Sequence, residues 1–166
     1  MQSFVTQRRL TVQAEETRAL GARLGRWARA GDIVACRGAL GAGKTTFVQG
    51  FAEGLGVGGN DYVRSPTFAL VHAYHGYIPL FHFDFYRLSS CAEVHDIGFD
   101  EYPEAGGVVI IEWADKFPEI LPPMRLEVSI RIADSDRRWL QSMAYDSSYG
   151  RYFLHADCDV YPYEMV

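Results

Sequence analysis

The stretch Gly38-Ala39-Leu40-Gly41-Ala42-Gly43-Lys44-Thr45 decides how this chain folds. It has the spacing of a phosphate-binding loop, in which a glycine and four further residues precede Gly-Lys-Thr. An apolar run at residues 32–36 comes before it, and residues 44–55 show an apolar side at helical spacing. The sequence therefore predicts a buried strand, a glycine-rich loop and a helix whose N-terminus faces bound phosphate.

This loop predicts a nucleotide site. The Lys44 ammonium is expected to reach the β- and γ-phosphates, and the Thr45 hydroxyl to bind Mg²⁺. Backbone N–H groups complete the phosphate contacts, because they converge at the positive end of the helix dipole. The residues expected to bind the nucleotide are Gly38, Leu40, Gly41, Ala42, Gly43, Lys44, Thr45 and Thr46.

Hydrolysis requires further groups at the ends of neighbouring strands. Glu112 follows the apolar run at 108–111, which is typical of a buried parallel strand, and is expected to orient or deprotonate water. Asp84 lies on the polar side of the alternating segment 80–86 and is expected to contact Mg²⁺ directly or indirectly. Thr67 is expected to act as a switch threonine. A helix cap or a solvated group is the structural alternative for each acidic residue. The catalytic set is Lys44, Thr67 and Glu112, and the metal set is Thr45, Asp84 and Glu112.

The remaining chain predicts interleaved helices and strands, followed by consecutive strands. A helix is expected from Thr11, which would cap it, to Gly31. Its apolar stripe is Leu20, Leu24, Trp27 and Ala28. A short helix is expected after the capping box at 90–93. Strands are expected at 67–74, 80–86, 108–111, 125–132 and 137–145.

Strict alternation assigns faces to two of these strands. In 80–86 the phenylalanines are expected to face the core and Asp84 a cleft or solvent. In 125–132 the inward residues are expected to be Leu126, Val128, Ile130 and Ile132, and the outward ones Arg125, Glu127, Ser129 and Arg131. The fold class predicted is α/β, a P-loop NTPase-like three-layer fold whose central, mostly parallel sheet carries antiparallel additions. Residues 1–146 are expected to form one P-loop domain, and 147–166 a C-terminal tail.

Composition narrows the function classes. The 166 residues suit one domain, and 48% hydrophobic residues suffice for a sizeable core. A net charge of −5 argues against holding nucleic acid through bulk charge, so no DNA partner is expected. The N-terminus does not have the pattern of a secretory signal, no run suits a membrane span, and three widely spaced cysteines suggest no disulfide framework. A cytoplasmic location is expected.

Several further segments occur in a recognisable order. They are Gly41-Ala42-Gly43-Lys44-Thr45-Thr46-Phe47, Ser65-Pro66-Thr67-Phe68, His82-Phe83-Asp84-Phe85-Tyr86-Arg87-Leu88, Asp96-Ile97-Gly98-Phe99-Asp100-Glu101-Tyr102, Ile111-Glu112-Trp113 and Leu121-Pro122-Pro123. From about Thr11 to Leu140 the chain resembles the TsaE family, formerly called YjeE. The His-x-Asp-x-Tyr-Arg and Ile-Glu-Trp segments make this resemblance specific, because a phosphate loop alone identifies no family.

The resemblance implies an ATPase that uses ATP and Mg²⁺ and supports threonylcarbamoyladenosine modification of tRNA. It also implies action on the TsaB–TsaD protein complex, with tRNA contacted only indirectly. The family's nucleotide and Mg²⁺ residues match Gly41, Gly43, Lys44, Thr45 and Asp84, its catalytic glutamate matches Glu112, and its switch threonine matches Thr67. Ala39 departs from the pattern, since the family usually has aspartate there; backbone cradling of phosphate does not require that side chain.

Two other function classes use the same loop. A small P-loop kinase would need arginines in a mobile lid, and the sequence has no arginine between Arg87 and Arg125. A nucleotide-gated binding module, whose occupied state matters more than hydrolysis, would use the same residues as an ATPase. Trp113 is expected either near the nucleotide or in the core, and His82 as a hydrogen-bond partner near the site. The arginines of residues 8–29 and the acids of 93–119 either guide docking or form solvated faces.

Overall fold

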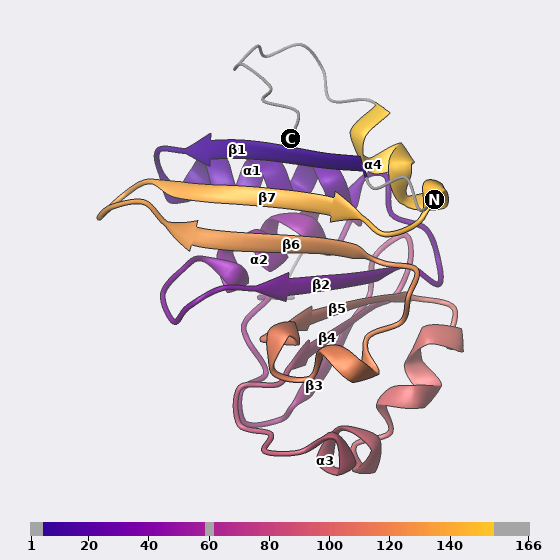
Figure 1. Cartoon of the computed structure of the whole chain (residues 1–166). Helices are drawn as coiled ribbons and strands as arrows, with labels where there is room; N and C mark the ends of the chain where they lie inside the picture. Colours follow the sequence, from indigo (N-terminus) through magenta and orange to yellow (C-terminus); the bar gives the residue numbers. More distant parts are fainter. Residues whose placement is uncertain (1–4, 59–61, 155–166) are drawn as a thin grey trace.

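The computed structural model describes residues 5–58 and 62–154, which contain a seven-stranded sheet in the order β1-β7-β6-β2-β5-β4-β3 (Figure 1). Its centre is parallel and consists of β6 (Leu126–Ile132), β2 (Ile33–Arg37), β5 (Val108–Glu112) and β4 (Leu80–Asp84). Antiparallel strands extend both sides: β7 (Arg138–Ala144) and β1 (Val5–Thr11) beyond β6, and β3 (Val71–Tyr74) beyond β4. The predicted parallel sheet with antiparallel additions is confirmed.

Helices cover both faces of this sheet. On one face lie α1 (Ala14–Gly25) and α2 (Lys44–Gly54), which Figure 1 shows behind the upper strands. The other face is covered by α3 (Cys91–Asp96) and the 3₁₀ helices η1 (Phe99–Glu104), η2 (Ala114–Lys116) and η3 (Pro118–Ile120). Two hydrophobic clusters result, one on each face, so the molecule has three layers.

Strand β2 shows why the central strands have continuous apolar sequences. Val34 and Cys36 lie in the cluster under α1 and α2, whereas Ile33 and Ala35 lie in the opposite cluster. Because successive side chains of a strand point to opposite faces, a strand covered on both faces needs apolar residues at every position. The strand carboxyl ends therefore emerge from a rigid, buried centre, and the glycine-rich loop leaves from one of them.

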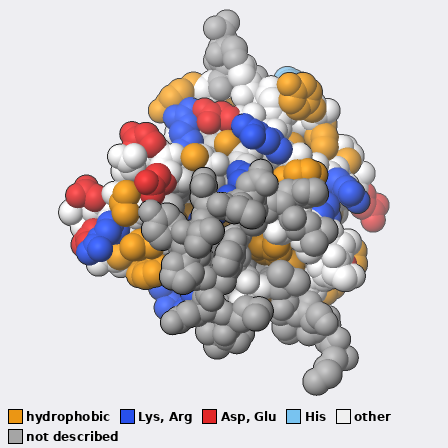
Figure 2. All heavy atoms as spheres, turned by 90° about the horizontal axis from the view of Figure 1, so that it is seen from above, with side chains coloured by type: hydrophobic (Ala, Val, Ile, Leu, Met, Phe, Trp, Pro, Cys, Tyr) orange, Lys and Arg blue, Asp and Glu red, His pale blue; other side chains and the backbone are white. Residues whose placement is uncertain are grey.

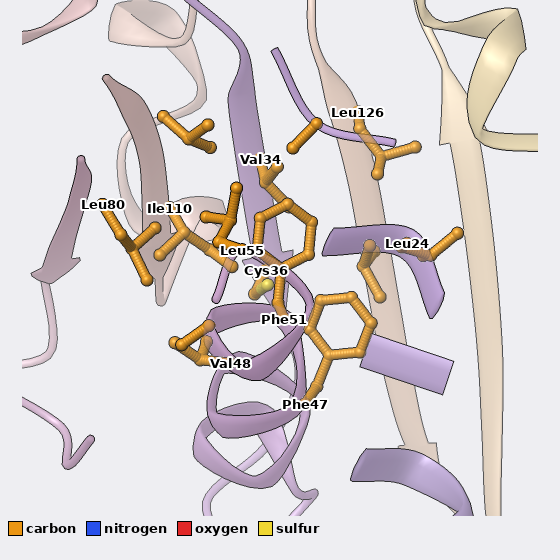
Figure 3. Close-up of a cluster of buried hydrophobic side chains, with 14 of the residues drawn as sticks. Leu24, Val34, Cys36, Phe47, Val48, Phe51, Leu55, Leu80, Ile110 and Leu126 are labelled. Carbon is orange, nitrogen blue, oxygen red and sulfur yellow. The ribbon is translucent and has the colours of Figure 1, made fainter. Parts of the chain in front are cut away.

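The two long helices contact each other through backbone as well as side chains. Figure 3 shows Phe47 and Phe51 of α2 beside Leu24 of α1. At Gly50 of α2, an added Cβ would lie 1.8 Å from the carbonyl oxygen of Arg18. At Gly21 and Gly25 of α1 and Gly54 of α2, an added Cβ would lie 2.2, 2.1 and 2.2 Å from a carbonyl oxygen of the facing helix. Close packing of the helices thus fixes the position of α2, which begins with Lys44.

The N-terminal prediction requires correction. Thr11 does not cap a helix: it ends β1, which pairs with β7 along its whole length, and α1 begins at Ala14 after Gln13. The helix ends at Gly25 rather than at Gly31, so Trp27 lies beyond it and is 36% exposed. The Thr11 hydroxyl instead bonds that of Thr17, 2.8 Å away.

Strand boundaries and faces also differ from the prediction in places. β3 begins at Val71 rather than at residue 67, because a turn closed by the Leu70 N–H to Pro66 O bond precedes it. In β6, Ile132 is 50% exposed at the end of the strand, although it was expected to face inward. Glu127, expected outward, is buried between Arg37 and Arg125, which both form ion pairs with it.

The chain after β7 returns to the sheet. It forms η4 (Ser147–Gly150) and α4 (Arg151–Leu154), and the Tyr149 hydroxyl accepts a hydrogen bond from the Ile33 N–H at 2.9 Å. Tyr152 donates to Asp32 at 2.6 Å, and both tyrosines are buried. Residues 149–153 therefore pack on the domain that was predicted to end at residue 146. The rest of the predicted tail, 155–166, lies outside the described residues.

Surface charge is mixed on the face seen in Figure 2, which looks from above the view of Figure 1. Lysine and arginine side chains occur there beside aspartate and glutamate. Arg18, one of the arginines of residues 8–29, pairs with Glu53. Among the helices in the described part of the chain, none has the length and apolar character needed to cross a membrane.

Candidate nucleotide-binding site

The glycine-rich loop joins the end of β2 to the start of α2. Gly43 precedes the helix with φ of 104°, a conformation that favours glycine. At Gly38, an added Cβ would lie 2.4 Å from the Ile130 carbonyl oxygen, so this position has no room for a side chain. The first N–H groups of a helix have no acceptor within the helix. The loop thus places free donors of α2 beside the ends of the parallel strands.

Lys44 is buried at this junction, with only 5% of its surface exposed. Its ammonium donates to the carbonyl oxygens of Gly38 at 2.6 Å and Ala39 at 3.0 Å. It also lies 3.7 Å from the centre of the Trp113 ring, which is a cation–π distance. Burial lowers the pKa of Lys44, while the nearby carboxylate of Glu112 opposes this shift. A polyphosphate would offer this cation stronger acceptors than two carbonyls and a ring.

Glu112 ends β5 and is 2% exposed. Both of its carboxylate oxygens accept from the Thr45 hydroxyl, at 3.0 and 2.9 Å. The same carboxylate lies 2.9 Å from Nε2 of His82, which confirms His82 as a hydrogen-bond partner near the site. Glu112 thus contacts the start of α2 and strand β4 at once.

Asp84 ends β4 and lies directly opposite Glu112 in the sheet register. One of its oxygens accepts from the hydroxyls of Ser65 and, at 3.0 Å, Thr67. Its other oxygen accepts from the Tyr86 N–H at 2.8 Å. Asp84 was expected to face a cleft or solvent. It lines a pocket, but it is only 2% exposed because these hydroxyls cover it.

These groups surround one pocket of ≈ 440 Å³. Its lining residues are Leu40, Gly41, Gly43, Lys44, Thr45, Thr46, Ser65, Thr67, Asp84, Tyr86, Glu112 and Trp113. Hydroxyl and carboxylate oxygens are suitable ligands for Mg²⁺, which is usually held by one or two carboxylates together with water and substrate phosphates. In residues 5–58 and 62–154, no three His, Cys, Asp or Glu side chains form a ready-made metal site. These oxygen ligands therefore fit a magnesium ion whose remaining coordination positions are taken by water or phosphate.

Comparison with known proteins identifies the family. The family model described as "Threonylcarbamoyl adenosine biosynthesis protein TsaE" matches residues 11–140. The chain is 43% identical to the tRNA threonylcarbamoyladenosine biosynthesis protein TsaE of Bacillus subtilis over 140 residues, which cover 84% of this chain and 86% of that protein. The protein of the same name from Treponema pallidum is 42% identical over 125 residues, covering 75% of this chain and 91% of the relative. The chain belongs to the TsaE family.

A solved structure supports the same fold. The crystal structure of Bacillus subtilis YdiB superposes with a TM-score of 0.78 at 36% sequence identity, covering 92% of this chain and 95% of that one. The mixed α/β sheet with a parallel centre is thus shared with a solved protein, consistent with a P-loop NTPase-like fold. The TsaE family is involved in the biosynthesis of tRNA threonylcarbamoyladenosine.

In this TsaE-family chain, most of the predicted site residues line the pocket, including Leu40, Lys44, Thr45, Thr67, Asp84 and Glu112. Gly38 and Ala42 are not among the lining residues. The Gly38 carbonyl holds Lys44, and the Ala42 N–H donates to the Ala39 carbonyl at 3.1 Å. The two residues therefore support the shape of the loop here.

Three residues of this TsaE-family chain that line the pocket or contact its loop had no role predicted from the sequence. Ser65 binds Asp84 beside Thr67, and its place next to Pro66 in a recognised segment was the available signal. Tyr86 packs on Trp113, with ring centres 5.0 Å apart, at the pocket wall. Arg138 of β7 donates from Nε to the Ala42 carbonyl at 3.2 Å, and no local pattern indicates this contact because the two residues are far apart in sequence.

Proposed function

We propose that this chain binds and hydrolyses ATP with Mg²⁺ in the threonylcarbamoyladenosine modification of tRNA. In this proposal it is a cytoplasmic accessory protein that acts on the TsaB–TsaD complex and meets tRNA only through that complex. The observation that carries the proposal is the convergence of the buried Lys44 ammonium with the carboxylates of Asp84 and Glu112 on one pocket at the start of α2. A buried cation beside a phosphate-binding loop is suited to the β- and γ-phosphates of a nucleotide.

Each residue then has a stated role. Lys44 neutralises phosphate charge, and the free N–H groups at the start of α2 bind phosphate oxygens. Thr45, Asp84 and Glu112 would hold Mg²⁺ directly or through water. The bound ion would neutralise charge that develops on the β- and γ-phosphates. The Glu112 carboxylate orients the attacking water or accepts its proton, and Thr67 is available to leave Asp84 for the γ-phosphate or the metal.

This proposal is tested by measuring the rate of ATP turnover by the full chain, alone and with TsaB and TsaD. Lys44→Ala should lose nucleotide affinity by at least about tenfold, because charge-assisted bonds to phosphate disappear. Glu112→Gln should bind ATP as the parent does but turn it over about 10²–10⁴-fold more slowly. Parent-like hydrolysis by Glu112→Gln in the complex would show the catalytic assignment to be wrong.

Two further assays, of phosphate transfer and of tRNA modification, separate the two other function classes. Transfer of phosphate to a small-molecule hydroxyl would identify a kinase, a function disfavoured by the absence of arginine between Arg87 and Arg125 in the sequence. A nucleotide-gated module predicts that Glu112→Gln, although defective in hydrolysis, supports tRNA modification at the parental rate. An ATPase accessory protein predicts that repeated turnover of the complex falls together with hydrolysis.

A further inference from the structure

His82 is a buried polar side chain with apolar neighbours on its own strand and on β5. It lies in the middle of β4 and is 0% exposed. Its neighbour in the register of β5 is Ile110, and Leu80 precedes it on the same face; both are also 0% exposed. An apolar residue would pack at this position without bringing polar atoms into the interior. Packing alone therefore does not explain a histidine here.

The two ring nitrogens of His82 have different environments. Nε2 lies 2.9 Å from Oε1 of Glu112. Nδ1 is buried and has no hydrogen-bond partner among the residues that the structure describes. A carboxylate accepts hydrogen bonds, so a proton is assigned to Nε2, the ring nitrogen that faces Glu112. Among the described residues, the ring therefore has a hydrogen-bond partner only at Nε2, and that partner is Glu112.

The other donor to Glu112 has a different position. Thr45 lies in the first turn of α2, where its hydroxyl also faces the pocket and is available to a metal ion. His82 is held by a strand that is buried on both faces and that also carries Asp84 two residues later. Its contact with Glu112 therefore links the middle of β4 to the end of β5 independently of what α2 binds.

We propose that His82 is a positioning residue whose Nε2–H holds the Glu112 carboxylate in a fixed orientation at the pocket. This inference rests on the proposed function, in which Glu112 acts on water. Buried hydrogen-bond partners of this kind typically change activity by about 10- to 100-fold when they are removed. His82→Leu should therefore lower kcat for ATP by about 10- to 100-fold, while the affinity for a non-hydrolysable ATP analogue stays within about twofold of the parent.

Two polar variants make the test independent of packing. A glutamine amide nitrogen reaches roughly the position of Nε2, whereas an asparagine amide nitrogen reaches only that of Nδ1. His82→Gln should restore most of the turnover and His82→Asn should not. The matched control is His72→Leu, because His72 faces His82 across β3 and β4 but bonds Tyr74. This control should keep parental turnover. If circular dichroism shows that His82→Leu does not fold, the turnover of His82→Gln compared with that of His82→Asn decides whether His82 positions Glu112.

Nitrogen-15 NMR of the nucleotide-free chain adds a readout that does not depend on catalysis. The imidazole signals of His82 should show a protonated Nε2, and the Nε2–H signal should shift in Glu112→Gln. An unprotonated Nε2, or equal turnover in the Gln and Asn variants, would overturn the inference. Parental kcat in His82→Leu together with a large loss in Glu112→Gln would overturn the inference alone. Parental kcat in Glu112→Gln would instead overturn the proposed function.

Discussion

At the residue scale, the glycine-rich loop depends on a side chain from the other end of the chain. Arg138 donates to the carbonyls of Ala42 at 3.2 Å and Gly41 at 3.4 Å, while its Nη1 donates to the Asp134 carbonyl at 2.9 Å. One guanidinium thus joins the loop to the turn between β6 and β7. It holds carbonyls, so it shapes the loop without itself facing a phosphate.

Arg138→Met should therefore weaken nucleotide binding by roughly tenfold, because the free loop loses the contacts that order it before binding. Calorimetric titration with a non-hydrolysable ATP analogue measures this affinity. Arg137→Met is the matched control, since Arg137 is exposed and its side chain pairs with Asp134 within the same turn. Equal affinities in the two variants would contradict a role for Arg138 in shaping the loop.

At the element scale, the position of α2 is set by its contact with α1. Glycines on both helices let the backbones approach more closely than any side chain permits. Since α2 begins with Lys44 and Thr45, the geometry of the pocket depends on this contact.

Gly50→Ala should lower the free energy of unfolding by about 1–3 kcal/mol. The new Cβ would lie 1.8 Å from the Arg18 carbonyl oxygen, so the helices must move apart. Urea unfolding measures the change. Gly58→Ala is the control, because a Cβ there meets nothing within 4 Å. If Gly50→Ala unfolds at the same urea concentration as the parent, the close approach of α1 and α2 does not contribute to stability.

The elements that the sequence predicted well are those whose signals are local. The loop, α2, β2 and β5 follow from glycine spacing and from continuous apolar runs. Glu112 follows from its place after an apolar run, and Asp84 from the alternation of residues 80–86. β1 was missed because Gln7, Arg8 and Arg9 give it no apolar pattern; its strand form depends on pairing with β7. The roles of Glu127 and Arg138 depend in the same way on neighbours that are brought together only by the folded sheet.

At the scale of the whole molecule, the segment after β7 closes one end of the domain. Burial raises the pKa of Tyr149 to about 12, and its hydroxyl accepts the Ile33 N–H. Tyr152, whose pKa burial also raises, donates to Asp32 beside it. Both tyrosines thus connect residues 147–154 to the start of β2.

Tyr149→Phe should lower the free energy of unfolding at pH 8 by about 1–3 kcal/mol, because the Ile33 N–H loses its partner. In the parent, unfolded Tyr149 ionises from about pH 10 but the folded residue only near 12. Its stabilising contribution is therefore complete below pH 10 and is lost between pH 10 and 12.

Between pH 10 and 12 the free energy of unfolding should fall less in the variant than in the parent. Some fall should remain in the variant, because Tyr152 is still present and burial raises its pKa too. Urea unfolding at pH 8 and pH 11 measures both effects. Tyr62→Phe, at a side chain that is 77% exposed, is the control and should match the parent at both pH values. An unchanged alkaline loss in Tyr149→Phe would contradict the assignment.

The pairing of β1 with β7 has a consequence for synthesis on the ribosome. Val5 is opposite Ala144 and Thr11 is opposite Arg138, so within residues 5–58 and 62–154 the strand that is made first pairs with the one that is made last. During translation β1 must wait, without a native sheet partner, until nearly the whole domain has left the exit tunnel. Such long-range pairing slows folding, because closing a long loop costs conformational entropy before the paired strands form stabilising contacts. Strands β2, β4 and β5 emerge earlier, and the nascent chain is expected to assemble the walls of its nucleotide pocket before it closes the sheet.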